Sequence, residues 1–220
     1  MKTGITKKIR FLRHAESAAN AGLPTSDPGG IPLTENGKKA AERTALEYDG
    51  EIPELIVVSP FLRARQTAEP FIARFRDAKV ETWPVQEFTY LCPEKCVGTT
   101  YTERKPMVEA YWHDASPAYV DGPQAESFEE FIARVMEALD RLRERAEENI
   151  LVVCHGILMQ AAEFYRDSNG DPAAPESMRR FYRYMLDFRV PNLGCIDLEV
   201  SAQGEIAWAR QFETTREPAE

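Results

Sequence analysis

Residues with the chemistry to bind an anion and to act as a nucleophile follow three short strand-like runs of this sequence. The runs are residues 9–12, 55–58 and 150–154, and the polar residues after them are Arg13, His14, Ser59, Arg63, His155 and Gly156. The chain has only three histidines, and two of them occupy these equivalent positions. One histidine near a strand end is usually an ordinary loop residue, but the repetition at three strand ends indicates a common site.

This set of side chains suits a doubly charged tetrahedral anion such as a phosphate group. The guanidinium groups of Arg13 and Arg63 match phosphate oxygens, and Asn20, one histidine and the backbone of Gly156 can complete the binding. The other histidine can then attack phosphorus in line, provided that its second ring nitrogen donates to a carbonyl and so fixes the tautomer. Because phosphoryl transfer depends mainly on positioning and charge stabilisation, this set predicts a reaction without a metal ion or other cofactor.

The segments around these positions alternate between strand and helix patterns. Helices are predicted within residues 34–48, 60–75 and 127–148, a further strand within 78–85, and a hairpin within 194–213 that turns near Gln203 and Gly204. This alternation predicts an α/β fold, a three-layer α/β/α sandwich with a mostly parallel central sheet. Ligands of such sheets bind outside the carboxyl ends of the strands, so the polar side chains at the three strand ends should meet in one crevice.

The length of the chain sets its domain organisation. A sequence of 220 residues can bury one good core, and we expect one domain over residues 1–220. The stretch 91–124 is rich in proline, glycine and aromatic residues, and its apolar residues follow neither the period of a helix nor that of a strand. It is therefore interpreted as a lid-like insertion. Ser59 is expected to be the N-cap of the helix that Pro60 begins.

Composition excludes several classes of partner. The net charge of −9 argues against a sequence-independent nucleic-acid binder and against attachment to an anionic membrane surface. No run reaches the roughly 18 apolar residues of a spanning helix, and the N-terminus lacks the apolar region of a signal peptide. The spacing of Cys92 and Cys96 has no second ligand pair nearby, so a zinc site is not expected. These features predict a reduced, cytoplasmic enzyme.

Five motifs together resemble those of the histidine phosphatase superfamily, also called the phosphoglycerate mutase-like family. In chain order they are RHAESAAN (13–20), DPGGIPLTENG (27–37), SPFLRARQTA (59–68), AESFEEFIARV (125–135) and VVCHG (152–156). The resemblance runs from residue 9 to about 200. It departs from the family pattern at Ala15, where the family usually has glycine.

The resemblance implies a role for each residue of the crevice. His14 matches the nucleophile that becomes a phosphohistidine. Arg13, Arg63 and His155 match the phosphate clamp, and Asn20 matches a further ligand of the pocket.

The general acid of the family matches less well. Glu87 in WPVQEFTYL is the best match, but Leu91 stands where the family commonly has a glycine. Glu126 is the alternative acid, and a solvated carboxylate at a strand end is the alternative interpretation of Glu87.

The resemblance implies a phosphoric monoester hydrolase of the general type of the histidine acid phosphatases. Within the family it favours a phosphatase of the mutase-like branch, because Gly156 excludes the aspartate that follows the second histidine in the acid phosphatases and phytases themselves. The expected partner is a small phosphorylated substrate. Mutase-type transfer and a catalytically silent binding module are the alternatives. The sequence leaves open the oligomeric state and which of seven residues of the lid region line the pocket: Tyr90, Lys95, Tyr101, Arg104, Lys105, Trp112 and His113.

Overall fold

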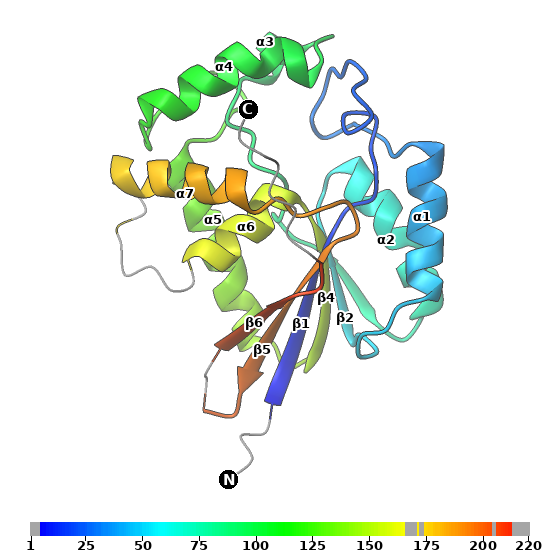
Figure 1. Ribbon diagram of the computed structural model, residues 1–220. Helices are drawn as coiled ribbons and strands as arrows, with labels where there is room; N and C mark the ends of the chain where they lie inside the picture. Colours follow the sequence, from blue (N-terminus) through cyan, green and yellow to red (C-terminus); the bar gives the residue numbers. More distant parts are fainter. Residues whose placement is uncertain (1–4, 166–170, 172–173, 204–205, 213–220) are drawn as a thin grey trace.

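The computed structural model describes residues 5–165, 171, 174–203 and 206–212. Six strands form one sheet in the order β3-β2-β4-β1-β5-β6 (Figure 1). The strands are β1 (Ile5–Arg13), β2 (Leu55–Val58), β3 (Lys79–Thr82), β4 (Asn149–Cys154), β5 (Cys195–Ser201) and β6 (Ile206–Arg210). β1, β2, β3 and β4 pair with one another in parallel. β5 pairs in antiparallel fashion with β1 on one side and with β6 on the other. The mostly parallel sheet that the sequence predicts is therefore confirmed.

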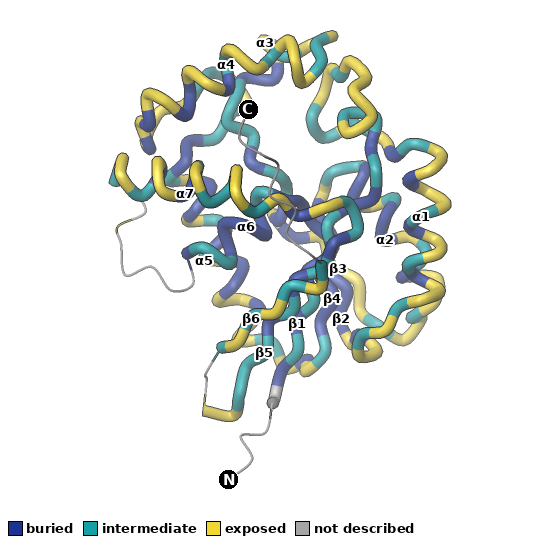
Figure 2. The backbone as a smooth tube through the Cα atoms, viewed as in Figure 1, coloured by how far each residue is buried: buried dark blue, intermediate teal, exposed yellow. Residues whose placement is uncertain are grey.

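The described residues form seven helices. They are α1 (Glu35–Leu46), α2 (Leu62–Arg74), α3 (Pro93–Cys96), α4 (Tyr101–Asp114), α5 (Phe128–Glu144), α6 (Gly156–Tyr165) and α7 (Pro175–Asp187). Of these, α1 and α2 cover one face of the sheet, and α5, α6 and α7 cover the other. Alternate residues of each strand point to opposite faces, so Phe11 joins the core with α5, α6 and α7, and Leu12 joins the core with α1 and α2. Figure 2 shows the strands largely buried and the outward faces of α1, α4 and α7 exposed. These three layers confirm the predicted sandwich.

The strand register brings the three predicted strand ends together. Arg13, the last residue of β1, pairs with Cys154 of β4, and Val58 of β2 pairs with Val153. The backbone continues these ladders beyond the strands, because His14 N–H donates to the Cys154 carbonyl at 3.0 Å. The residues that follow β1, β2 and β4 consequently lie side by side at one edge of the sheet.

The start of α2 differs from the sequence prediction. α2 begins at Leu62 with Phe61 as its N-cap, and that cap makes no side-chain hydrogen bond. Ser59 is not the N-cap; its hydroxyl lies 2.7 Å from Nε2 of His155 and accepts from the Phe61 N–H, ahead of the helix, at 3.3 Å. The predicted hairpin exists as the β5–β6 pair; of its expected turn, Gly204 lies outside the described residues.

The stretch 91–124 contains the helices α3 and α4, which the sequence periodicity did not predict. Thr100 and Glu103 form a capping box at the start of α4, and Trp112 near its end stacks on Tyr182 of α7, with ring centroids 4.8 Å apart. Figure 1 shows both helices beyond the carboxyl ends of the strands, near the loop that precedes α1. Thr25 of that loop bonds to the Thr99 backbone at 3.2 Å.

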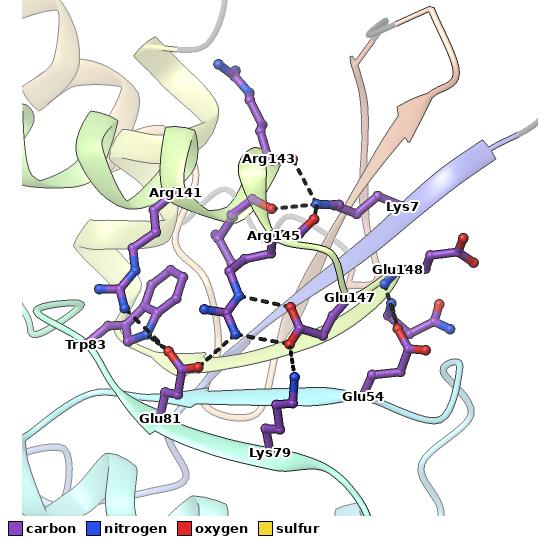
Figure 3. A network of polar contacts seen from close by, with 12 residues as sticks. Lys7, Glu54, Lys79, Glu81, Trp83, Arg141, Arg143, Arg145, Glu147 and Glu148 are labelled. Atoms are coloured by element: carbon purple, nitrogen blue, oxygen red, sulfur yellow. Dashed lines mark hydrogen bonds and ion pairs between the residues drawn. The ribbon is translucent and has the colours of Figure 1, made fainter.

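A polar network fixes the opposite end of the sheet (Figure 3). Lys7 of β1 donates from Nζ to the carbonyls of Leu142, Arg143 and Arg145, which end α5, at 2.5–2.9 Å. Because the last carbonyls of a helix have no partner within the helix, Lys7 completes the hydrogen bonding of α5 and ties it to the sheet.

Candidate active site

His14 is buried at the end of β1, with 3% of its surface exposed. Its Nδ1 lies 2.7 Å from the carbonyl oxygen of Ala15, and its Nε2 lies 3.2 Å from Nε of Arg63. A guanidinium can only donate, so Nε2 of His14 is the acceptor and carries the lone pair. Nδ1 is then the protonated nitrogen and donates to Ala15. This is the tautomer that nucleophilic attack through Nε2 requires.

The surroundings of His14 keep its ring neutral. Burial lowers the pKa of His14 well below 6.5, and the charges of Arg63 and Arg13 lower it further. Only the hydrogen bond to Ala15 acts in the opposite direction. The lone pair on Nε2 is therefore available at neutral pH.

His155 lies against His14 at the end of β4. The ring centroids of the two histidines are 5.1 Å apart. Ser59 Oγ lies 2.7 Å from Nε2 of His155, while Nδ1 of His155 is buried without a hydrogen-bond partner among the described residues. Burial, followed by the charge of Arg63, lowers the pKa of His155 well below 6.5. The site thus contains a second neutral imidazole with one unused nitrogen.

Arg13 and Arg63 provide the positive charge of the site. Arg13 Nη1 donates to the Val190 carbonyl at 2.6 Å, and its buried Nε has no partner among the described residues. Arg63 Nη1 donates to the Pro28 carbonyl at 2.7 Å. Burial lowers the pKa of Arg63 to about 10, so it stays protonated at neutral pH. Two oriented guanidinium groups with unused donors form an anion-binding site.

Gly156 begins α6 directly beside Arg13. A Cβ atom at this position would lie 3.3 Å from Arg13 Nε, so glycine allows the arginine to lie close to the first turn of the helix. The close packing places the N-terminus of α6 at the same edge as the histidines.

Glu87 follows β3 and reaches the same helix N-terminus. Its Oε2 accepts from the N–H of Ile157 at 3.3 Å, and its Oε1 accepts from the N–H of Phe88 at 3.2 Å. Burial raises the pKa of Glu87 above 4.5, although Arg63, Arg13 and the two backbone donors oppose the rise. A carboxyl group that keeps its proton to higher pH is suited to act as a general acid.

Glu126, the alternative acid, is already engaged. Arg134 of α5 donates to both of its oxygens, at 2.6 and 3.1 Å, and Thr89 N–H donates to it at 3.2 Å. Arg134 Nη1 also donates to the carbonyls of Pro84 and Gln86. The ion pair of Arg134 and Glu126 therefore holds the backbone on both sides of Glu87. The carboxylate of Glu126 is engaged in this support.

Asn20 lies at the exposed rim. Its Oδ1 accepts from Ser17 Oγ at 2.9 Å and from Asn192 Nδ2 at 3.2 Å. Asn192 Nδ2 also lies 2.9 Å from the His14 carbonyl. The amide nitrogen of Asn20 remains for a ligand, and Asn192 links the rim to the nucleophile.

Three residues of the site were missed by the sequence reasoning: Ser59 as the partner of His155, Asn192, and Thr67. Thr67 Oγ1 accepts from the Ala15 N–H at 3.0 Å and so holds the turn after His14. The position of Ser59 at a strand end was a usable signal. Asn192 lies 178 residues from His14 in the chain, and no local pattern marks it.

The structure shows which of the seven candidate residues of the lid region line a cavity at the site. A cavity of about 230 Å³ opens beside Arg63 and Glu87, and among the seven only Tyr90, Tyr101 and Arg104 line it. The others have different surroundings: Lys95 pairs with Asp121, Lys105 lies 3.9 Å from Glu109, Trp112 is buried against Tyr182, and His113 is exposed beside Asp114.

The described residues contain no group of three or more His, Cys, Asp or Glu side chains that could hold a metal ion. Cys92 and Cys96 are free thiols. Within the same residues, no helix is long and apolar enough to cross a membrane.

The sequence of the chain matches a family model. The model of the histidine phosphatase superfamily (branch 1) covers residues 9–169, a range that includes Arg13, His14, Asn20, Arg63, Glu87, Glu126, His155 and Gly156. The chain belongs to this superfamily. A search of curated proteins finds no match to the chain.

Solved structures of other proteins share the fold of this histidine phosphatase superfamily member. An α-ribazole phosphatase from Shigella flexneri is 21% identical, with a TM-score of 0.67 over 95% of this chain and 96% of that chain. A mycobacterial glucosyl-3-phosphoglycerate phosphatase is 19% identical, with a TM-score of 0.67 over 93% and 97%. A phosphoserine phosphatase from Entamoeba histolytica, solved with 3-phosphoglyceric acid, is 19% identical, with a TM-score of 0.67 over 94% and 98%.

Proposed function

We propose that this protein is a phosphatase that hydrolyses a phosphate monoester of a small molecule through a phosphohistidine on His14. The observation that carries the proposal is the tautomer of His14, with Nδ1 donating to Ala15 and Nε2 accepting from Arg63. Nε2 of a neutral imidazole is nucleophilic, and a positive clamp surrounds it. Membership of the superfamily, and structural relatives that are phosphatases, support the same activity.

In the first step, the lone pair of His14 Nε2 forms a bond to phosphorus. The bond between phosphorus and the ester oxygen breaks, and Glu87 gives its proton to the leaving alcohol. Arg13 and Arg63 neutralise the charge on the phosphoryl oxygens. If Ser59 donates to Nε2 of His155, the unused Nδ1–H of His155 supplies a further donor.

In the second step, water replaces the alcohol. Glu87, now a carboxylate, accepts a proton from the attacking water, the bond between phosphorus and Nε2 breaks, and inorganic phosphate leaves with His14 neutral again. Each group returns to its starting state, so the cycle needs no metal ion or cofactor.

Two other activities use the same fold and are less well supported. A silent binding module has no need of a general acid, whereas Glu87 has a raised pKa beside both arginines. A mutase must also hold a second phosphate, and the cavity beyond Arg63 offers one other cation, Arg104, whose Nη1 already bonds to Thr25 and Thr99.

The experiment is release of inorganic phosphate from p-nitrophenyl phosphate by the purified protein. We expect turnover that survives EDTA, is blocked by vanadate, and is lost in His14→Ala. Strong inhibition by EDTA that a divalent ion reverses, or turnover that persists in His14→Ala, contradicts the proposal.

A further inference from the structure

The cavity beside Arg63 and Glu87 is apolar over most of its wall. Its apolar and aromatic lining consists of Pro28, Ile31, Phe61, Phe88, Tyr90, Leu91, Tyr101, Val108 and Ile157. These residues come from the loop before α1, the start of α2, the segment after β3, α4 and α6. The space adjoins both the phosphate clamp and the proposed acid, so it is the space that a leaving alcohol would occupy.

The cavity carries little charge beyond the catalytic groups. Among the described residues that line it, Arg104 is the only charged one apart from Arg63 and Glu87. Its Nη1 lies 3.0 Å from the Thr99 carbonyl, 3.2 Å from Thr99 Oγ1 and 3.3 Å from Thr25 Oγ1. Burial raises the pKa of Cys96 and of Tyr90, so both stay neutral. The other polar side chains that line the cavity, among them Thr25, Ser26 and Thr89, are neutral. A second phosphate group of a substrate would therefore meet only Arg104 as a further cation among the described lining residues, and much of its surface would be buried against apolar side chains.

The wall of the cavity is held in place from two sides. Thr25 N–H donates to the Thr99 carbonyl at 3.2 Å, and Gly98 N–H donates to the Thr25 carbonyl at 2.9 Å. These bonds join the loop before α1 to the start of α4, and Figure 1 shows the two segments beside each other. Arg104 adds a side-chain link across the same contact. Its role in the structure is thus to connect the two segments.

Tyr101 is the exposed aromatic residue of this wall. It is the first residue of α4, lines the cavity, and is 58% exposed. An aromatic ring placed against it would bury apolar surface on both partners and gain the ring contact itself. A cavity of about 150 Å³ lined by apolar side chains holds a benzene molecule, so about 230 Å³ has room for one substituted ring.

We propose that the alcohol part of the substrate is an apolar ring that binds in this cavity against Tyr101, rather than a polyol or an acid. This inference rests on the proposed phosphatase function for its chemistry. The largely apolar wall favours a ring over the polar groups of phosphorylated sugars and glycerates, while Arg13, Arg63 and His14 recognise the phosphate group that all these esters share.

Binding tests the inference without depending on turnover. We would compare 2-phenylethylphosphonate and 2,3-dihydroxypropylphosphonate, which cannot be hydrolysed as esters, by isothermal titration calorimetry. We expect the phenyl compound to bind at least about tenfold more tightly, and Tyr101→Ala to reduce this preference by about tenfold. Tyr119→Ala is the matched control, because Tyr119 is also an exposed tyrosine of residues 91–124 but does not line the cavity. It should leave the preference unchanged.

Equal affinity for the two phosphonates, a preference for the diol, or no measurable binding of either overturns the inference. So does a preference that Tyr101→Ala does not reduce. Hydrolysis provides a second comparison, because 2-phenylethyl phosphate and glycerol 1-phosphate are both primary alkyl esters. If the protein hydrolyses glycerol 1-phosphate better, the phosphatase function stands and the ring inference fails. If it hydrolyses no ester but keeps the phosphonate preference, the phosphatase function fails and the ring inference stands.

Discussion

The side-chain Nε of Arg63 lies 3.2 Å from Nε2 of His14, the atom that attacks phosphorus in the proposed mechanism. This contact serves two purposes before a substrate arrives. It requires a lone pair on Nε2, and it places a positive charge beside the position that the phosphoryl group will occupy. Arg63 is itself held by the Pro28 carbonyl, so the charge is oriented in advance.

We predict that Arg63→Ala lowers kcat/KM by about 10²–10³-fold, equivalent to about 2.7–4 kcal/mol of transition-state stabilisation, as for the loss of one preorganised donor. Arg63→Lys should recover little, because an ammonium group lacks the fork geometry of guanidinium. Arg65→Ala is the control, since Arg65 is on the same helix and exposed. Steady-state kinetics with p-nitrophenyl phosphate measures all three; similar rates for Arg63→Ala and Arg65→Ala would exclude Arg63 from the clamp.

A second prediction concerns Glu87. An alkoxide needs a proton in order to leave, whereas p-nitrophenolate leaves unaided, and general acid catalysis is worth about 10²–10⁴-fold. Glu87→Gln should therefore slow hydrolysis of an alkyl phosphate by that order and p-nitrophenyl phosphate much less. Glu126→Gln should show a smaller dependence on the leaving group than Glu87→Gln, because Glu126 only supports the segment of Glu87 through Arg134 and Thr89. If Glu126→Gln alone shows the dependence on the leaving group, Glu126 is the acid.

Glu87 is also expected to set the pH dependence of the reaction at high pH. Burial raises the pKa of Glu87 above 4.5, and the protonated form is the acid, so alkyl phosphate turnover should fall as the pH rises through this raised pKa. The pKa of His14 is below 6.5, so its neutral form is kept as the pH falls through 6.5, and turnover should not decline there. A pH profile of kcat/KM measures both limbs; in Glu87→Gln the high-pH limb should disappear.

Arg134 is predicted to be a positioning residue for Glu87. It donates to the carbonyls of Pro84 and Gln86 and to Glu126, so Arg134→Met should release the segment that carries Glu87. We expect alkyl phosphate turnover to fall by about tenfold or more, p-nitrophenyl phosphate turnover to fall less, and the high-pH limb to shift. Arg134→Lys should restore part of the loss.

The control for Arg134 is Arg143→Met, a substitution on the same helix at a residue that pairs with Asp140. Thermal unfolding of each variant separates a positioning effect from lost stability. A uniform slowing of both substrates with an unchanged pH profile would show that Arg134 only supports the fold.

A further prediction concerns the other end of the sheet. Lys7 is 8% exposed and donates to three carbonyls at the end of α5. Lys7→Met leaves these acceptors without a donor, so it should lower the free energy of unfolding by about 1–3 kcal/mol. The neighbouring Lys8 makes an exposed pair with Glu51, and Lys8→Met should change stability by less than about 1 kcal/mol. Urea unfolding measures both, and equal effects would contradict the capping role of Lys7.

The strand ends could be predicted from the sequence because they depend on local patterns. An apolar run that stops at a polar residue marks the carboxyl end of a strand, and parallel pairing brings such ends to one edge. Arg13, His14, Arg63 and His155 therefore meet where the pattern indicated.

Contacts that depend on tertiary packing could not be predicted in this way. Ser59 has the sequence context of an N-cap, but its hydroxyl bonds to His155, 96 residues away. Asn192 reaches His14 from the loop before β5. α4 was missed because it contains Pro106 and its apolar side chains do not form one continuous stripe; Val108, Tyr111 and Trp112 hold it through packing.

The proposed mechanism requires that His14 becomes phosphorylated during turnover. The most direct measurement is mass spectrometry of the protein after brief mixing with a phosphate ester and quenching under alkaline, denaturing conditions. We predict one phosphoryl group on His14 that is lost in acid, is stable in base, and is absent from His14→Ala. A phosphoryl group on Ser17 or on a cysteine, or no adduct on His14 while phosphate is being released, would contradict the mechanism.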